Sequence, residues 1–140
     1  MRDDAAAIVR RLRAAGHEAY WVGGCVRDLV RGVAPKDFDI VTAARPEEVQ
    51  VLFPRTAPVG ARFGVVIVVE NGRPYEVATF RTEAEYDDGR HPSRVAFATA
   101  EEDVRRRDFT INGLLMDPET GRMVDFVGGR EDIERQTIRA

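Results

Sequence analysis

The sequence predicts an α+β domain in which a mixed sheet of about five strands has helices packed on it. Two observations lead to this fold class. Segments with apolar residues at helical spacing are intermixed with short β-prone runs, and no internal repeat, linker or low-complexity stretch interrupts them. The length of 140 residues also suits one domain with a real core and is too short for two ordinary ones. We therefore expect residues 1–140 to form a single domain.

The first half of the chain is predicted to mix helices and strands. Apolar side chains at helical spacing near the N-terminus are followed by Gly16, a good helix stop. Gly23 and Gly24 end a strand and open a helix, and Pro46 with two following acids begins another. The expected elements are a helix over residues 3–15, a strand over 19–22, a helix over 25–31, a strand over 37–42 and a helix over 45–53.

The second half is predicted to hold most of the strands. The continuous apolar run F-G-V-V-I-V-V is typical of a strand buried on both faces. Asn71-Gly72 predicts a hairpin turn, and Thr99 predicts a helix cap. Residues 83–94 are polar and contain Gly and Pro, which predicts a mobile surface loop. The expected elements are strands over 63–69, 75–80 and 95–99, a helix after Thr99, two short strands around the turn 117–121, and a helix over 130–135.

Composition and charge limit the function classes. The net charge of −3 argues against a strongly basic nucleic-acid binder, so much of any contact to nucleic-acid phosphates should come from elsewhere. The basic residues are nearly all arginine, which suits phosphate contacts but also fits a GC-rich genome or selection for heat stability. No apolar run is long enough to span a membrane, and the N-terminus does not resemble a signal peptide. With Cys25 as the single cysteine, we expect a cytoplasmic protein.

Two aspartates one residue apart form the most informative pair in the chain. Period two places Asp37 and Asp39 on the same face of a strand, while Phe38 and Ile40 point the other way. Two carboxylates on one face repel each other unless a positive charge lies between them, and a divalent cation is the usual solution. The Gly-Gly turn upstream can hold a phosphate with backbone N–H groups. Together these features indicate nucleotide chemistry.

Other candidates remain open on the residues alone. Glu76 lies among apolar neighbours in a predicted strand, where it could bind a metal or simply face solvent. His91 could be a ligand or a general base, or a solvated loop residue. Cys25 could be read as a nucleophile, but no histidine is near it in sequence. The block R-R-R-D-F-T-I-N-G carries Asp108 and Asn112 beside an apolar run, where buried polar groups must be satisfied.

Three blocks resemble a known family. G-G-C-V-R-D with K-D-F-D, then E-V-A-T-F-R-T-E, then R-R-D-F-T-I-N-G-L resemble the head (catalytic) domain of the bacterial class II tRNA nucleotidyltransferase and poly(A) polymerase family. The resemblance runs from Tyr20 to the end of the chain. It implies a DNA polymerase β-like nucleotidyltransferase fold. It also implies addition of nucleotides from CTP and ATP to a tRNA 3′ end without a nucleic-acid template, as in CCA addition or repair.

The resemblance assigns roles to particular positions. Asp37 and Asp39 resemble the pair that binds two Mg²⁺ ions, and Glu76 stands where a third carboxylate is expected. No general-base side chain is then required, because the metal ions lower the pKa of the RNA 3′-hydroxyl. The residues that the resemblance implies for nucleotide binding are Gly23, Gly24, Arg27, Arg107, Asp108 and Asn112.

The sequence departs from the family's pattern in two places. Gly113 follows Asn112 where alanine is usual, and the chain stops at Ala140, before the neck, body and tail domains of the family. We therefore expect an excised head domain, with base selection and most of the RNA grip outside it. The same head would serve an enzyme that adds only CC, only A, or a poly(A) tail.

Two other classes of function stay in view. One is a non-catalytic nucleotide-binding module that keeps the fold without turnover. The other is a metal-dependent sugar-nucleotide transferase, which also uses an Asp-x-Asp pair. That second class leaves the Gly-Gly-x-x-Arg-Asp and Arg-Arg-Asp blocks unexplained.

Overall fold

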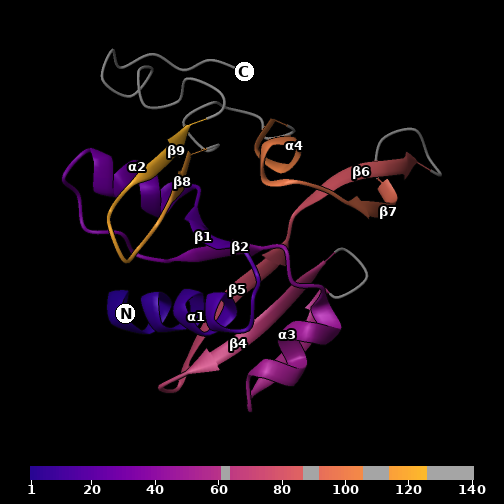
Figure 1. Cartoon of the computed structure of the whole chain (residues 1–140), viewed down its shortest axis with the longest axis horizontal. Coiled ribbons are helices and arrows are strands. Elements are labelled where there is room, and N and C mark those ends of the chain that lie inside the picture. The colour runs from indigo at the N-terminus through magenta and orange to yellow at the C-terminus, as the bar shows by residue number, and fades with distance from the viewer. Residues whose placement is uncertain (61–63, 87–91, 106–113, 126–140) are drawn as a thin grey trace.

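The computed structural model describes residues 1–60, 64–86, 92–105 and 114–125, which form a mixed sheet with helices on both faces (Figure 1). The predicted α+β class and mixed sheet are confirmed. The sheet has seven strands, where the sequence predicts about five, and two further strands pair separately. No helix in these ranges is long and apolar enough to cross a membrane.

The elements are α1 (Arg2–Ala14), β1 (Ala19–Val22), α2 (Gly24–Val30), β2 (Asp39–Thr42), α3 (Pro46–Leu52), β3 (Thr56–Gly60), β4 (Val65–Glu70), β5 (Arg73–Thr79), β6 (Arg81–Tyr86), β7 (Pro92–Phe97), α4 (Ala100–Arg105), β8 (Leu114–Met116) and β9 (Met123–Asp125).

The strand order is β3-β4-β5-β2-β1-β8-β9. All neighbours pair antiparallel except β2 and β5, which are parallel. β4 and β5 are joined through Asn71 and Gly72, whose φ angles of 51° and 77° suit a tight hairpin turn, as predicted. The parallel pairing sets Ile40 beside Val77. Two segments far apart in the sequence therefore meet in the middle of the sheet.

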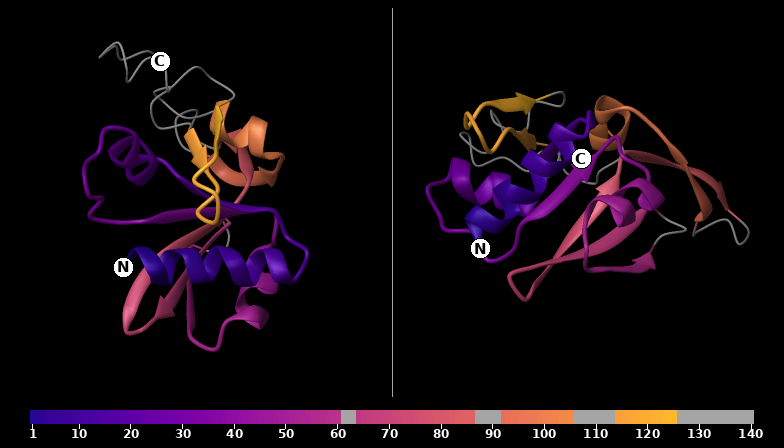
Figure 2. Two further views of the ribbon diagram at one scale, coloured as in Figure 1. Left: turned by 60° about the vertical axis from the view of Figure 1, so that its left-hand side comes forward. Right: turned by 60° about the horizontal axis from the view of Figure 1, so that its bottom comes forward.

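The two faces of the sheet are covered differently (Figure 2). α1 buries Ile8 and Leu12 against one face, and α3 packs on the same face. On the opposite face, α4 buries Val104 against the ends of β1, β2 and β8. At the start of β2 and β5 that second face remains exposed, and Asp39 and Glu76 lie there. The exposed part of this face is where a ligand can reach the sheet.

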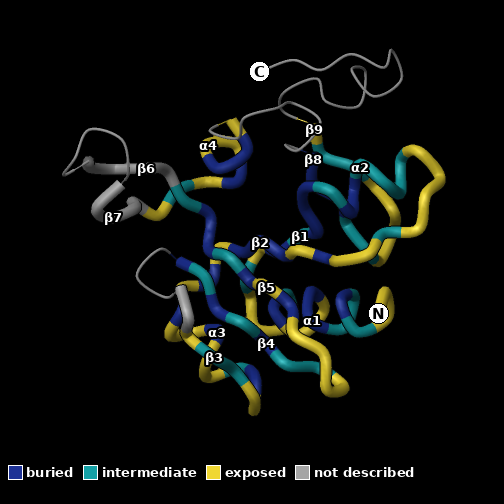
Figure 3. The backbone as a smooth tube through the Cα atoms, turned by 180° about the vertical axis from the view of Figure 1, so that it is seen from behind, coloured by how far each residue is buried: buried dark blue, intermediate teal, exposed yellow. Residues whose placement is uncertain are grey.

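The observed burial (Figure 3) corrects two strand predictions. β2 begins at Asp39, so the strand predicted from residue 37 starts two residues later. β4 is not buried on both faces: Val66 and Val68 are fully buried, whereas Ile67 between them is half-buried. The reason is that α1 and α3 cover only one face there. A run of β-branched residues cannot reveal which of its two faces stays open.

Two strand regions differ more strongly from the sequence prediction. β3 was not predicted because it contains Pro58, a residue depleted in strands, but an edge strand tolerates proline. The loop predicted over residues 83–94 is wrong for the described part of that range, because residues 83–86 of β6 pair with β7; residues 87–91 lie outside the described residues. At the base of this hairpin, the buried Asp103 carboxylate accepts the Arg81 backbone N–H at 2.9 Å. This contact fixes the hairpin to α4.

The remaining described elements follow the sequence closely. α1, β1, α2 and α3 lie within a residue or two of the predicted ranges, as do the two strands around the turn 117–121. Thr99 caps α4: its hydroxyl accepts the Glu102 backbone N–H at 3.2 Å, and the Glu102 carboxylate accepts the Thr99 backbone N–H at 3.1 Å. The helix predicted over residues 130–135 lies outside the described residues.

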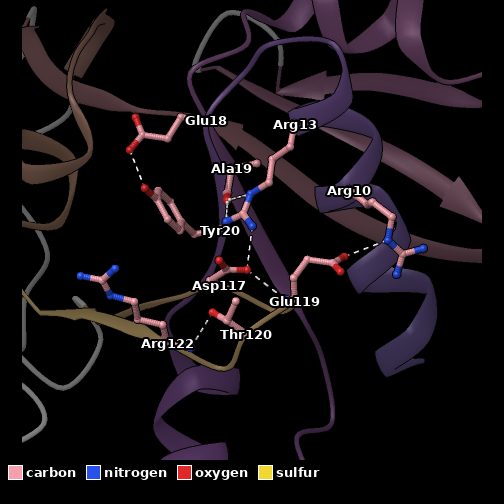
Figure 4. Close-up of polar contacts among 9 residues, drawn as sticks. All are labelled: Arg10, Arg13, Glu18, Ala19, Tyr20, Asp117, Glu119, Thr120 and Arg122. Atoms are coloured by element: carbon pink, nitrogen blue, oxygen red, sulfur yellow. Dashed lines mark hydrogen bonds and ion pairs between the residues drawn. The ribbon is translucent and has the colours of Figure 1, made fainter.

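Arginines of α1 fasten this helix to the turn between β8 and β9 (Figure 4). The Arg13 guanidinium donates to the Ala19 carbonyl at 2.7 and 3.1 Å and to the Asp117 carboxylate at 2.6 Å. Arg10 pairs with Glu119 at 2.8 Å. These two arginines have structural partners, so part of the arginine content serves the packing of α1 against the sheet.

Candidate active site

The turn between β1 and α2 requires a glycine at its first position. Gly23 has a φ of 79° and a ψ of −137°, a conformation open almost only to glycine. Its carbonyl accepts the backbone N–H groups of Val26 and Arg27, both at 3.1 Å, which starts the helix. α2 has no side-chain cap. The sequence prediction that a Gly-Gly pair ends the strand and opens the helix is confirmed.

The second glycine leaves space for a guanidinium. A Cβ added at Gly24 would lie 3.3 Å from Arg27 Nη2 and 3.8 Å from its Cζ. Arg27 Nε also donates to the Asp28 carboxylate at 3.3 Å, and its side chain is 34% exposed. The turn therefore presents backbone N–H groups and one half-exposed guanidinium side by side. An anionic phosphate is the natural ligand for such a set.

Asp39 lies directly beside this turn. As the first residue of β2 it pairs with Val22, the residue that precedes Gly23. Asp37 lies just before the strand, yet burial alternates through it: both aspartates are exposed, and Phe38 between them is 3% exposed. Phe38 is anchored against the Trp21 ring, with ring centres 4.8 Å apart. The predicted arrangement, with both carboxylates on the side opposite Phe38, agrees with this burial.

Glu76 lies on the other side of Asp39. The parallel register pairs Ile40 with Val77, so the residues before them, Asp39 and Glu76, are neighbours on β2 and β5. Glu76 is exposed, so its carboxylate faces solvent, and it does so beside the carboxylate of Asp39. A cavity of about 460 Å³ is lined by Asp37, Asp39, Glu76 and Ile67, together with Met1, Phe38, Arg73, Pro74 and Tyr75.

Comparison with known proteins identifies the family. Residues 19–139 match the family model described as the poly A polymerase head domain. The chain belongs to this family. The resemblance found in the sequence blocks is thereby confirmed.

Relatives of this head domain are named for their activity. The CCA-adding enzyme of Bacillus cereus (strain B4264) is 55% identical over 135 residues, which is 96% of this chain and 34% of that protein. The structure of the Bacillus stearothermophilus CCA-adding enzyme in complex with CTP superimposes with a TM-score of 0.88 at 44% identity, covering 99% of this chain and 33% of that one. A tRNA nucleotidyltransferase complexed with a primer tRNA and an incoming ATP analog has a TM-score of 0.74 at 29% identity, covering 95% and 38%. The chain spans about a third of the length of these relatives.

The donor chemistry of the head domain fits a hard divalent cation. Asp37, Asp39 and Glu76 supply only carboxylate oxygens, the ligands that Mg²⁺ prefers. Among the described residues, however, no three His, Cys, Asp or Glu side chains converge closely enough to hold a metal ion by themselves. Mg²⁺ is commonly held by one or two carboxylates together with substrate phosphates. The residues therefore suit a metal that binds with a nucleotide.

Cys25 of the head domain has no nucleophilic character. Its side chain is 4% exposed, and its Sγ lies 3.4 Å from the Val22 carbonyl. Burial, with a further contribution from the negative charge of Asp39, raises the pKa of Cys25 to about 11. The thiol is therefore protonated at neutral pH and unreactive, because the thiolate is the nucleophile.

The remaining predicted site residues lie outside the described part of the chain. These are Arg107, Asp108, Asn112 and His91. The described elements that flank residues 106–113 are α4 and β8, and both border the sheet face that carries Asp39. Because these residues are not described, the roles implied for Arg107, Asp108 and Asn112 stay predictions.

Sequence reasoning missed Ile67, along with the lining residues Met1, Arg73, Pro74 and Tyr75. Ile67 was assigned to a strand buried on both faces, but it lies beside Glu76 and lines the same cavity. The sequence could have indicated this in part, because alternation along a strand places Ile67 on the opposite face from Val66 and Val68. What the sequence lacked was the pairing of β4 with β5, which sets Ile67 opposite Glu76.

Proposed function

We propose that this chain is the catalytic head of an enzyme that transfers CMP and AMP from CTP and ATP to the 3′ end of tRNA, as in CCA addition or repair. One observation carries the proposal: Asp39 lies between the glycine turn at Gly23 and Gly24 on one side and Glu76 on the other. The names of the relatives, CCA-adding enzymes, support the same reaction.

Each group of residues has a chemical task in this proposal. Asp37 and Asp39, with Glu76 as a third carboxylate, hold two Mg²⁺ ions together with the nucleotide phosphates. Mg²⁺ held there would supply the positive charge that lowers the pKa of a 3′-hydroxyl and neutralises charge on pyrophosphate. The backbone at Gly24 and the Arg27 guanidinium orient the triphosphate and stabilise its charge. Arg107, Asp108 and Asn112 complete the nucleotide site from the segment after α4.

The proposed substrates and partners follow from the relatives. A structural neighbour binds CTP, and another binds a primer tRNA with an ATP analog. Because this chain spans about a third of such proteins, we assign most of the tRNA grip to regions outside it. The weakly acidic net charge of −3 agrees with this division. We keep the cytoplasm as the proposed compartment.

A second candidate is a nucleotide-binding module that has no turnover on its own. Poly(A) addition, or addition of only CC or A, also stays compatible with this head domain, whose family is described by the poly A polymerase name. All of these candidates share the glycine turn and the carboxylates; they differ in whether a product forms and in which nucleotides are added.

The test measures incorporation of labelled CMP and AMP into tRNA that lacks its CCA end. At a tRNA concentration high enough to offset the weak tRNA grip of this chain, the wild-type protein is expected to label the tRNA in the presence of Mg²⁺, and Asp39→Asn is expected to abolish labelling. Asp3→Asn is a matched control, because it removes the same charge from the exposed first turn of α1. Mg²⁺-dependent CTP binding without labelling would favour the non-catalytic module. Normal labelling by Asp39→Asn would contradict the proposal.

A further inference from the structure

Three side chains form a row across the exposed part of the sheet. Ile67 on β4 pairs with Glu76 on β5, and Glu76 lies beside Asp39 on β2. All three are on the face opposite α1, because their strand neighbours Val66 and Val77 are buried under the helices of the other face. The row therefore joins one apolar side chain directly to two carboxylates.

The apolar end of this row is partly accessible. Ile67 is half-buried and lines the cavity of about 460 Å³ together with the carboxylates. A cavity of this size is within the range of small-molecule sites. Such sites combine a few placed polar groups with apolar walls that contact the rest of the ligand. Ile67 and Pro74 provide such an apolar wall beside Glu76.

The strand order gives the row a direction. Along β1-β2-β5-β4, the phosphate-binding turn at Gly24 comes first, then Asp39, then Glu76, and Ile67 comes last. The carboxylates thus lie between a group that binds phosphate and a side chain that contacts carbon atoms. A transferred phosphoryl group over the carboxylates would have the turn on one side and Ile67 on the other.

Phosphoryl transfer places the attacking and leaving oxygens roughly in line, on opposite sides of the phosphorus. In the proposed function the triphosphate is held at Gly24 and Arg27, so the pyrophosphate leaves on that side. The attacking 3′-hydroxyl must then approach from the side of Glu76. Of the described apolar side chains that line the cavity, Ile67 lies directly beyond Glu76 on this approach.

We propose that Ile67 is the floor of a subsite for the 3′-terminal nucleoside of the RNA acceptor strand. The ligand is a ribonucleotide with a free 3′-hydroxyl, whose sugar or base packs on the isoleucine while its hydroxyl reaches the carboxylates. Ile67 is a positioning residue: it orients the attacking nucleoside and takes no part in bond making. This inference rests on the proposed nucleotidyl transfer.

The test is NMR on the chain labelled with ¹³C at isoleucine methyl groups and with ¹⁵N at backbone amides. The probes are Mg²⁺ with a CTP analogue that cannot be cleaved at the α-phosphate, and then a short oligoribonucleotide with a free 3′-hydroxyl. The analogue is expected to shift the backbone amides of Gly23 and Gly24. The oligoribonucleotide is then expected to shift the Ile67 methyl signal and to leave that of Ile8, fully buried under the opposite face, unchanged.

Variants separate positioning from structure. Ile67→Ala is expected to weaken oligoribonucleotide binding about 10-fold, while binding of the CTP analogue changes less than about twofold. Ile67→Val should keep most of the wild-type affinity for the oligoribonucleotide. Val69→Ala is the matched control, because it lies on the same face of β4 but does not line the cavity. It should bind both probes as the wild type does.

Two results would overturn the subsite. One is an Ile67 methyl signal that the oligoribonucleotide leaves in place. The other is a signal that shifts fully with the CTP analogue alone, which would make Ile67 part of the nucleotide site. Failure of the proposed function itself would give another result: the CTP analogue with Mg²⁺ would not shift the backbone amide signals of Gly23 and Gly24.

Discussion

Gly24→Ala should separate the stability of the β1–α2 turn from its binding of phosphate. Gly24 begins α2, and its φ lies outside the left-handed region, so alanine suits its backbone. The added Cβ would lie 3.3 Å from Arg27 Nη2, which is a tight contact with the far end of a flexible side chain. The guanidinium therefore has to shift by only a few tenths of an ångström, at little cost to the fold, but the shift moves it from its position beside the turn.

The two effects have different magnitudes. Alanine in place of glycine adds up to about 1 kcal/mol of helix propensity, so the free energy of unfolding should stay within about 1 kcal/mol of wild type. A hydrogen bond between charged groups contributes about 1.5–3 kcal/mol. Complete loss of the Arg27 contact would weaken CTP binding about 10- to 150-fold, so a small displacement should weaken it toward the lower end of that range. Gly24→Ala is therefore expected to lower the affinity for CTP and to leave the free energy of unfolding nearly unchanged.

The neighbouring glycine provides the contrast. Gly23→Ala forces a residue with a Cβ into a φ of 79° and a ψ of −137°, which costs on the order of 1–3 kcal/mol. Thermal denaturation should thus show a clearly lower midpoint for Gly23→Ala and a near-normal one for Gly24→Ala. Calorimetric titration with CTP and Mg²⁺ should show weakened binding for Gly24→Ala. Wild-type CTP affinity in Gly24→Ala, or equal destabilisation by both variants, would refute the reasoning.

Three further predictions concern individual side chains. Glu76→Gln should lower kcat at least ~100-fold and leave CTP affinity within about twofold, because Glu76 lies on the side of Asp39 away from the turn at Gly23 and Gly24. Steady-state kinetics with tRNA would check this prediction, and an unchanged kcat would show that Glu76 is not part of the metal site. Partial burial acts to raise the pKa of Asp117, but hydrogen bonds from Arg13 and the Glu119 backbone outweigh it and leave the pKa lowered from 3.8. The stabilisation from Asp117 is therefore present above pH 3.8 and is lost as the pH falls through the lower folded value; the gap in melting temperature between wild type and Asp117→Asn should narrow in acid, and a constant gap would contradict it. Cys25, with its raised pKa and 4% exposure, should react with a thiol reagent at pH 8 only as fast as the protein opens, and Cys25→Ala should keep full activity.

Local chemistry made much of the site predictable from the sequence. Gly23 and Gly24 mark a turn because their backbone freedom is needed there, and Asp37 and Asp39 share a side because Phe38 and Ile40 must enter the core. These are short-range arguments. They held even though β2 starts only at Asp39.

What depends on pairing between distant segments could not be predicted. The neighbourhood of Asp39 and Glu76 comes from the parallel contact of β2 with β5, and a periodic pattern says nothing of strand order. The same pairing scheme decides that Ile67 faces the cavity. Polar composition over residues 83–94 likewise suggested a loop, although a hairpin held at its base by Asp103 can carry polar residues.

The most direct test of the central claim is a crystal structure of this chain with CTP and Mn²⁺, in which anomalous scattering locates the metal. The account predicts metal peaks at about 2.0–2.3 Å from carboxylate oxygens of Asp37 and Asp39, which is ligand distance for such ions. The triphosphate should lie against Gly24 and Arg27. A metal bound away from both aspartates, or a triphosphate held elsewhere, would contradict the account.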